Sequence, residues 1–273
     1  MLTQQLPTAA SEYAASQRLE QQAAVAAVLR QWTRMGNDFD TSWARIAPTV
    51  VAILSTAQAR VIAQSVAYVP AVLEETGQAA AIASAYQINQ SALVGVAGSG
   101  VNTVDLLGGA TINAKTTVKG GAAVLDALSG AGEWLSGTVG TVLSDTGRAA
   151  EGLGMNIRPV GGYVRMLTPP SCGRCVILAG KFYRKNQGFE RHPECDCRHI
   201  PASEVVAGDI TISPADYFDS LDEAGQAKLA GSAANAKAIR DGADIGQIVN
   251  AYRKTAGLSF AQASPIKRTR FGE

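Results

Sequence analysis

A chain of 273 residues can bury a substantial core, and it has room for one large domain or two ordinary ones. Its 24 Lys and Arg residues balance 23 Asp and Glu residues, and the resulting net charge of +1 excludes a global basic field that would recruit nucleic acid or a membrane surface. The first residues have neither the basic nor the apolar region of a secretory signal, and the apolar stretch 50–69 is interrupted by Gln58, Arg60 and Gln64. We therefore expect a soluble protein, made in the cytoplasm, without a membrane span.

Residues 1–95 are predicted to be a helical docking region. Apolar residues recur at helical spacing in two stretches, and such faces are suited to packing against other helices. Pro48 and Pro70 lie in the second stretch, and breaks are expected near both. The spaced residues are Val25, Val28, Leu29 and Trp32 in the first stretch, and Ile46, Val50, Ile53, Leu54, Val61 and Ile62 in the second.

Residues 96–155 are rich in glycine. The glycines recur in GVAGSG, LLGG, KGG and SGAGEWLSG. Each glycine inside a helix costs roughly 1 kcal/mol relative to alanine. We therefore expect short helices separated by turns in this part of the chain.

Residues 156–260 are predicted to form an α+β domain. GGYVRML (161–167) and GKFYRKN (180–186) are short, rich in aromatic or β-branched residues and bounded by Gly, so they predict a β-hairpin around the turn between Cys172 and Cys175. Helix starts are expected at Ser213, Ser220 and Asp244, and stops at Gly231, Gly242 and Gly257. Residues 261–273 form a basic tail. The whole chain is therefore assigned to the α+β class, with a mainly helical first part.

All four cysteines and both histidines lie between residues 171 and 201. Cytosolic conditions keep thiols reduced, so a cluster of this kind indicates metal rather than disulfides. Zinc prefers four thiolate or imidazole ligands in a tetrahedron, and two short chelating turns commonly supply them. The expected ligands are Cys172, Cys175, Cys195 and Cys197, with His192 as the alternative ligand. We expect His199 to act outside the first coordination shell or at the surface.

A site closed by four protein ligands leaves no position for water or substrate, so a structural zinc is favoured over a catalytic one. A catalytic zinc would need three ligands and a nearby acid, for which Glu190, Glu194 and Asp196 are the candidates. A hydrolytic triad is not expected, because both histidines lie in the predicted zinc loop. Phosphate-loop and dinucleotide-binding motifs are absent from the sequence. The sequence therefore offers no catalytic residues, and we expect a protein that is not an enzyme.

The segment 162–201, GYVRMLTPPSCGRCVILAGKFYRKNQGFERHPECDCRHIP, is followed by YFDSL (217–221) and AIRDGADIGQIVNAYR (238–253). Together they resemble the MuF-like minor head proteins of tailed bacteriophages, in the form found in phages of actinobacteria. The similar part covers roughly residues 100–260, and its most specific element is the Cys-x2-Cys with His-Pro-x-Cys-x-Cys. The first hundred residues resemble the family only in their helical character and carry no specific motif of it.

The resemblance implies a structural minor capsid protein of head morphogenesis, located in the virion at the capsid interior or portal vertex and in the host cytoplasm during assembly. The implied partners are the portal protein and the major capsid protein, with packaged DNA and other copies of the chain as further candidates and no membrane. Because family members are sometimes labelled capsid maturation proteases, the alternative function is a zinc-dependent hydrolase or maturation protease. A DNA-contacting packaging factor is a third hypothesis.

Overall fold

The computed structural model describes residues 6–78, 87–167, 171–188, 197–208, 210 and 212–251. The chain divides into two compact units, and each is described by itself. The larger unit comprises Gln4–Thr168 and Lys181–Thr211. The smaller unit comprises Met1–Thr3, Pro169–Gly180 and Ile212–Glu273. The described residues are mostly helical with a small antiparallel sheet, which confirms the α+β class.

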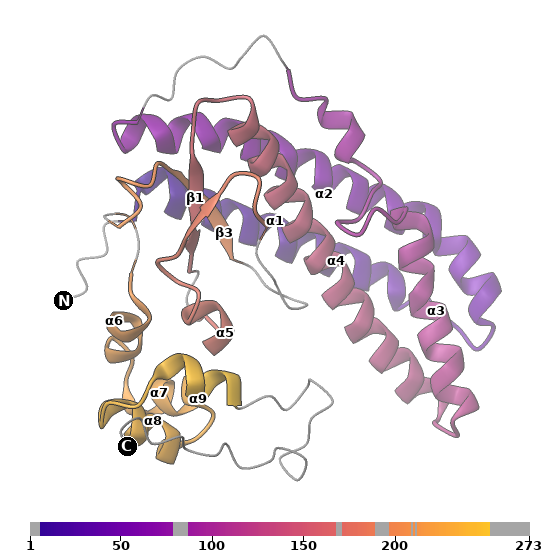
Figure 1. Ribbon diagram of the computed structural model, residues 1–273. Helices are drawn as coiled ribbons and strands as arrows, with labels where there is room; N and C mark the ends of the chain where they lie inside the picture. The colour runs from indigo at the N-terminus through magenta and orange to yellow at the C-terminus, as the bar shows by residue number, and fades with distance from the viewer. Residues whose placement is uncertain are drawn as a thin grey trace. The chain divides into compact units, whose positions relative to one another are not determined.

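Long helices make up most of the larger unit. Three of them pack against one another along their lengths, and a fourth packs on two of these (Figure 1). The three are α1 (Thr8–Trp32), α2 (Phe39–Glu75) and α4 (Val124–Asn156), and the fourth is α3 (Thr103–Lys119). A short 3-10 turn, η1 (Gln90–Leu93), lies against α2 and α4. The fully buried side chains between the helices include Val28, Val50, Leu54, Leu107, Leu135 and Leu143.

Helix α2 passes through both prolines without interruption, so the predicted breaks at Pro48 and Pro70 are wrong. Each proline removes one backbone donor and costs about 3 kcal/mol in a helix interior. Burial of the apolar face of α2 against α1 and α4 offsets that cost. The helix also has a strong start, because the Asp38 carboxylate accepts a hydrogen bond from the Thr41 amide at 3.1 Å.

Helix α2 is the one helix of the described part of the chain that is long and apolar enough to span a membrane. Its length and composition alone meet that criterion. The same helix supplies buried residues to the core shared with α1 and α4.

The glycine-rich segment forms two long helices, of 17 and 33 residues, so the prediction of short helices and turns there is also wrong. Several of these glycines lie where neighbouring helices approach closely. A Cβ atom at Gly109 would lie 2.7 Å from Trp134, and one at Gly154 would lie 2.9 Å from Val69. The glycines therefore permit close helix packing rather than ending the helices.

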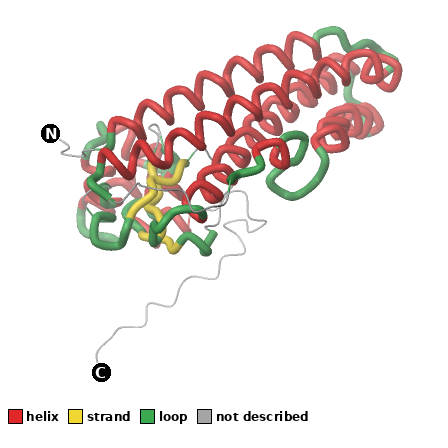
Figure 2. The backbone as a smooth tube through the Cα atoms, turned by 90° about the horizontal axis from the view of Figure 1, so that it is seen from above, coloured by secondary structure: helices red, strands yellow, loops and turns green. Residues whose placement is uncertain are grey.

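A three-stranded antiparallel sheet in the order β2-β1-β3 lies at one end of the long helices (Figure 2). Strand β1 (Gly162–Met166) pairs with β2 (Phe182–Arg184), which confirms the predicted hairpin. Strand β3 (Arg198–Ala202) was not predicted, because Pro201 and the cysteine motif obscure its pattern. A second buried cluster joins the sheet to α1, α2 and α4, and it includes Tyr13, Tyr68, Val69, Met155, Val164 and Ile200.

The smaller unit consists of short helices in its described part. They are α5 (Gly173–Val176), α6 (Pro214–Asp219), α7 (Glu223–Ala230), α8 (Ala233–Arg240) and α9 (Ile245–Ala251). Gly231 ends α7 in the left-handed conformation with a φ of 83°, and Gly242 follows α8 with a φ of 99°. Both predicted stops are confirmed, and Gly257 lies outside the described residues.

The helix starts of this unit agree with the sequence at two of three positions. The Ser213 hydroxyl accepts a hydrogen bond from the Asp216 amide, and the Asp244 carboxylate accepts one from the Gln247 amide. The predicted capping box at Ser220 is wrong, because the Asp222 side chain caps α7 instead. A carboxylate two residues further on is the better N-cap, since it accepts from the Gly225 amide at 2.7 Å.

Candidate functional site

Cys172 and Cys175 form a single chelating turn in the smaller unit. Cys172 precedes α5, and its carbonyl accepts hydrogen bonds from the amides of Cys175 and Val176 at 2.9 and 3.0 Å. This turn brings the two Sγ atoms to 3.4 Å from each other. Two thiolates bound to one tetrahedral zinc lie about 3.8 Å apart, so small side-chain adjustments would fit this pair to the metal.

Packing fixes the backbone of this turn. A Cβ atom at Gly173 would lie 3.0 Å from the Leu229 carbonyl oxygen of α7 and 3.1 Å from Val249 of α9. The glycine between the cysteines therefore lets α5 lie directly on its neighbours. Cys175 is buried there, whereas Cys172 is exposed and accessible to a ligand.

The remaining predicted ligands are only partly described. Cys197 is fully buried in the larger unit, directly before β3. Cys195 and His192 lie outside the described residues, as do Glu190, Glu194 and Asp196. Within the described ranges, no group of three or more His, Cys, Asp or Glu side chains is arranged to hold a metal ion. The complete zinc site therefore stays a prediction, with Cys172 and Cys175 as its described pair.

Arg148 of α4 holds the backbone at Cys197. Its guanidinium donates to the Cys197 carbonyl oxygen at 2.9 Å and to the Asp145 carboxylate at 2.5 Å. Arg148 and Asp145 are both buried. The pair therefore fixes the main chain at one predicted metal ligand, a role that nothing in the local sequence near Cys197 signals.

His199 is buried on β3, so the surface position considered for it is wrong. Its Nδ1 atom lies 3.0 Å from Glu151 Oε2, and its backbone amide donates to the same oxygen at 3.1 Å. The Tyr68 hydroxyl donates to the His199 carbonyl oxygen at 2.9 Å. The tilted ring of Tyr163 lies against the imidazole, with 4.1 Å between the ring centroids.

Glu151 links this histidine to the helical core. The Tyr13 hydroxyl donates to Glu151 Oε1 at 2.6 Å and lies 2.7 Å from the Ser65 hydroxyl. Burial acts to raise the pKa of Glu151. The hydrogen bond and charge of His199, the charge of Arg198 and the hydrogen bond from Tyr13 outweigh burial and leave the pKa of Glu151 below its usual value.

The hydrogen bonds around Glu151 connect α1, α2, α4 and β3, which is a structural role. Burial, followed by the nearby charge of Glu151, raises the pKa of Tyr13 well above its usual value, so this phenol stays protonated and donates to the carboxylate. One feature of the sequence could have indicated this buried network. Glu151 continues the buried stripe of α4 that includes Val139, Val142 and Leu143, where an acid is unusual without a partner. Its partners lie up to 138 positions away and could not be predicted from spacing.

In comparisons with known proteins, no family model, no curated protein and no solved structure matches this chain.

Proposed function

We propose that this protein is a structural minor component of a tailed-phage head. It would act during head morphogenesis at the portal and the capsid interior, with a single structural zinc held by Cys172, Cys175, Cys195 and Cys197. The resemblance of residues 162–201 and the two following segments to MuF-like proteins is the basis of the head assignment. The structural observation that supports the zinc is the 3.4 Å separation of the Cys172 and Cys175 sulfur atoms.

The cysteine turn supports a structural metal for two reasons. Its backbone is closed by its own hydrogen bonds and packed on α7 and α9, and this arrangement holds the two sulfur atoms close enough to chelate one metal ion. Four thiolates would complete the coordination of zinc and leave no position for a substrate. The metal would then contribute to folding rather than to catalysis.

Docking to the portal or capsid is proposed to use the predicted docking region, residues 1–95. Within it, helix α1 exposes Leu19 at 67 % of its surface. An exposed apolar side chain of this size can pack against a partner helix.

Two measurements on the assembled head test the proposal. Mass spectrometry of purified mature particles should detect the protein at a low copy number relative to the major capsid protein. Elemental analysis of the protein purified without chelator should find one zinc per chain. Absence of the protein from both proheads and mature particles would overturn the head assignment, and absence of stoichiometric zinc would overturn the metal assignment.

The alternative function is a zinc-dependent hydrolase or capsid maturation protease. It predicts cleavage of unprocessed major capsid protein by the metal-loaded chain. That cleavage should be lost in Glu190→Ala or Glu194→Ala, which remove the candidate acids, or in Ser171→Ala, which removes the hydroxyl group next to Cys172. The structural proposal predicts that the major capsid protein stays intact with every variant. Specific cleavage that one of these substitutions abolishes would replace the structural proposal by the enzymatic one.

A further inference from the structure

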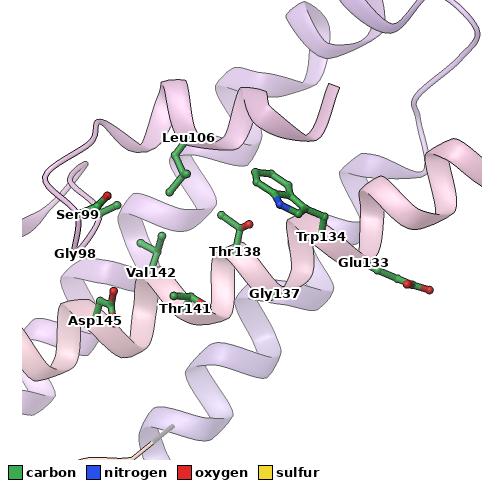
Figure 3. A pocket seen from close by; sticks show the side chains of 11 residues that line it. Gly98, Ser99, Leu106, Glu133, Trp134, Gly137, Thr138, Thr141, Val142 and Asp145 are labelled. Atoms are coloured by element: carbon green, nitrogen blue, oxygen red, sulfur yellow. The ribbon is translucent and has the colours of Figure 1, made fainter. Parts of the chain in front are cut away.

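One side of α3 packs on the larger unit, and the other side is exposed. On the packed side, Leu106 faces Trp134 and Val142 of α4 across a hollow of about 410 Å³ (Figure 3). A Cβ atom at Gly109 would lie 2.7 Å from the Trp134 ring, so α3 and α4 approach each other closely beside this hollow. The opposite side of α3, which includes Ile112, is exposed.

Apolar side chains gather on and beside this exposed side. Of the eight large apolar side chains that are exposed in the described part of the chain, five lie between residues 96 and 125. Ile112 of α3 is 66 % exposed, and Leu125, at the start of α4 just after the turn that follows α3, is 80 % exposed. The exposed Val104 lies two turns before Ile112, within about 80° of it around the helix. A cluster of this kind is typical of a surface that binds another protein.

Opposite charges lie at the two ends of the same side of α3. Asp105 is in the first turn of the helix and Lys119 in its last turn, and both are exposed. Ile112 lies midway between them, and because positions one heptad apart differ by only about 20° around a helix, the three form one row about 21 Å long. Lys115, the other lysine of α3, already pairs with Asp40 of α2. The ion pairs found among the described residues include neither Asp105 nor Lys119.

We propose that this side of α3 binds the same side of a second copy of the chain, with the two helices antiparallel and crossing at Ile112. A row with opposite charges at its ends complements itself when it is turned round, so Asp105 of each copy lies against Lys119 of the other. Such a contact has two-fold symmetry, as the interfaces of most protein dimers do. A membrane or a nucleic acid would instead favour a basic surface, whereas the charges of this row cancel. The proposal is independent of the zinc and of the head assignment.

Apolar contacts hold the two copies together, and the charges set the direction of the helices. Ile112 meets its counterpart at the two-fold axis. The antiparallel direction also brings Leu125 of each copy to the end at which the other copy has the exposed Val101 and Val104. One pair of helices about 25 Å long offers less area than the roughly 1,200–2,000 Å² that a stable complex buries. The dimer should therefore be weak, with a Kd on the order of 10–100 µM.

Sedimentation equilibrium of the full chain tests the proposal in reducing buffer, where disulfides between copies cannot form. The protein should be mostly monomeric near about 1 µM and largely dimeric near about 300 µM. Ile112→Asp should weaken association at least about a hundredfold, because two carboxylates then meet at the axis. Val205→Asp changes an exposed side chain of the same unit outside α3 and should leave association unchanged. A chain that stays monomeric up to about 500 µM, or a dimer that persists in an Ile112→Asp protein shown by circular dichroism to be folded, would overturn the proposal.

Charge reversal tests the antiparallel direction. Asp105→Lys and Lys119→Asp should each weaken the dimer about tenfold, since like charges then face each other at both ends of the contact. Mixing these two single variants should restore association, because each chain then meets opposite charges, and the double variant Asp105→Lys/Lys119→Asp should restore it within one chain. Unchanged association of both single variants, or no recovery in the mixture, would contradict the antiparallel pairing. A monomeric chain whose Ile112→Asp variant fails to enter heads would also overturn the proposal and assign this side of α3 to another head protein.

Discussion

At the scale of single residues, Glu151 brings a carboxylate into the core of the larger unit, where three polar groups surround it. Hydrogen bonds from Tyr13 and from the His199 amide, together with the His199 imidazole, hold its pKa below the usual value against the effect of burial. Because the folded-state pKa is the lower one, ionised Glu151 stabilises the fold above its unfolded pKa of about 4.3. That stability is lost as the pH falls through the folded value.

Replacing Glu151 by Gln tests this assignment. The variant should lower the free energy of unfolding by about 2 kcal/mol near neutral pH, because charge-assisted hydrogen bonds from Tyr13 and His199 are weakened. The difference from the original protein should shrink at acid pH, as the pH falls through the lowered pKa of Glu151 and its carboxylate becomes protonated. Denaturant unfolding at a series of pH values measures both effects. Glu12→Gln on the exposed side of α1 is the control, and a pH-independent difference for Glu151→Gln would contradict the assignment.

Cys172 and His199 lie in one motif but should respond differently to substitution. Cys172→Ser and Cys195→Ser should each abolish stoichiometric zinc and unfold the segment around the turn, since a structural zinc contributes on the order of 10 kcal/mol to folding. His199→Ala should keep one zinc per chain, because its imidazole is engaged with Glu151. Elemental analysis with circular dichroism before and after chelator addition distinguishes the variants. Full zinc content in Cys172→Ser would remove this residue from the ligand set.

The part of the candidate site that local spacing could predict is the turn between Cys172 and Cys175, because two ligands three positions apart share one turn whatever surrounds them. Glu151 and His199 are 48 positions apart, and their contact depends on how β3 packs against α4. Arg148 likewise reaches Cys197 only through the tertiary fold. Such contacts have no period in the sequence, so composition and spacing could not predict them.

At the scale of elements, the sequence predicted the hairpin and most caps, but it misjudged how α2 and α4 continue. Helix propensity predicts that Pro48 and the α4 glycines destabilise their helices. Burial of a whole helix face lowers the free energy of the folded state by more than this cost. The glycines were expected to shorten the helices, but in the structure they allow two helices to pack closely. At Gly154 the missing side chain is the space that the fully buried Val69 of α2 occupies.

Two glycines of α4 distinguish the packing role of glycine from its cost in helix propensity. Gly154→Ala should destabilise the protein by about 1–2 kcal/mol, because its Cβ would meet the buried Val69 side chain at 2.9 Å. Gly140→Ala should stabilise it by up to about 1 kcal/mol, because nothing lies within 4 Å of the added Cβ and alanine is the better helix former. Thermal and denaturant unfolding of the two variants measure the effects. A stabilising Gly154→Ala would show that α2 and α4 do not need this close approach.

At the scale of the whole molecule, the helical part of the chain has its own buried core, distinct from the small core around Phe218 in the smaller unit. Removing residues 1–95 would take α1 and α2 from that core and expose the packed faces of α3 and α4. A truncated protein would therefore confound loss of docking with loss of folding. Single exposed residues are the sharper test of where the proposed docking to the portal or capsid occurs.

Leu19 is exposed on α1, within the predicted docking region, and its replacement by Asp should leave the fold intact. If α1 docks on the portal or capsid, the buried charge should reduce incorporation into heads at least about tenfold, since an unpaired carboxylate in an apolar contact costs more than 1.4 kcal/mol. Val205→Asp is the matched control, because Val205 is 89 % exposed in the same unit but outside residues 1–95. Quantitative mass spectrometry of heads assembled with each variant measures the ratio to the portal protein. Normal incorporation of Leu19→Asp would move the docking surface away from this face of α1, and loss with Val205→Asp alone would place it near β3.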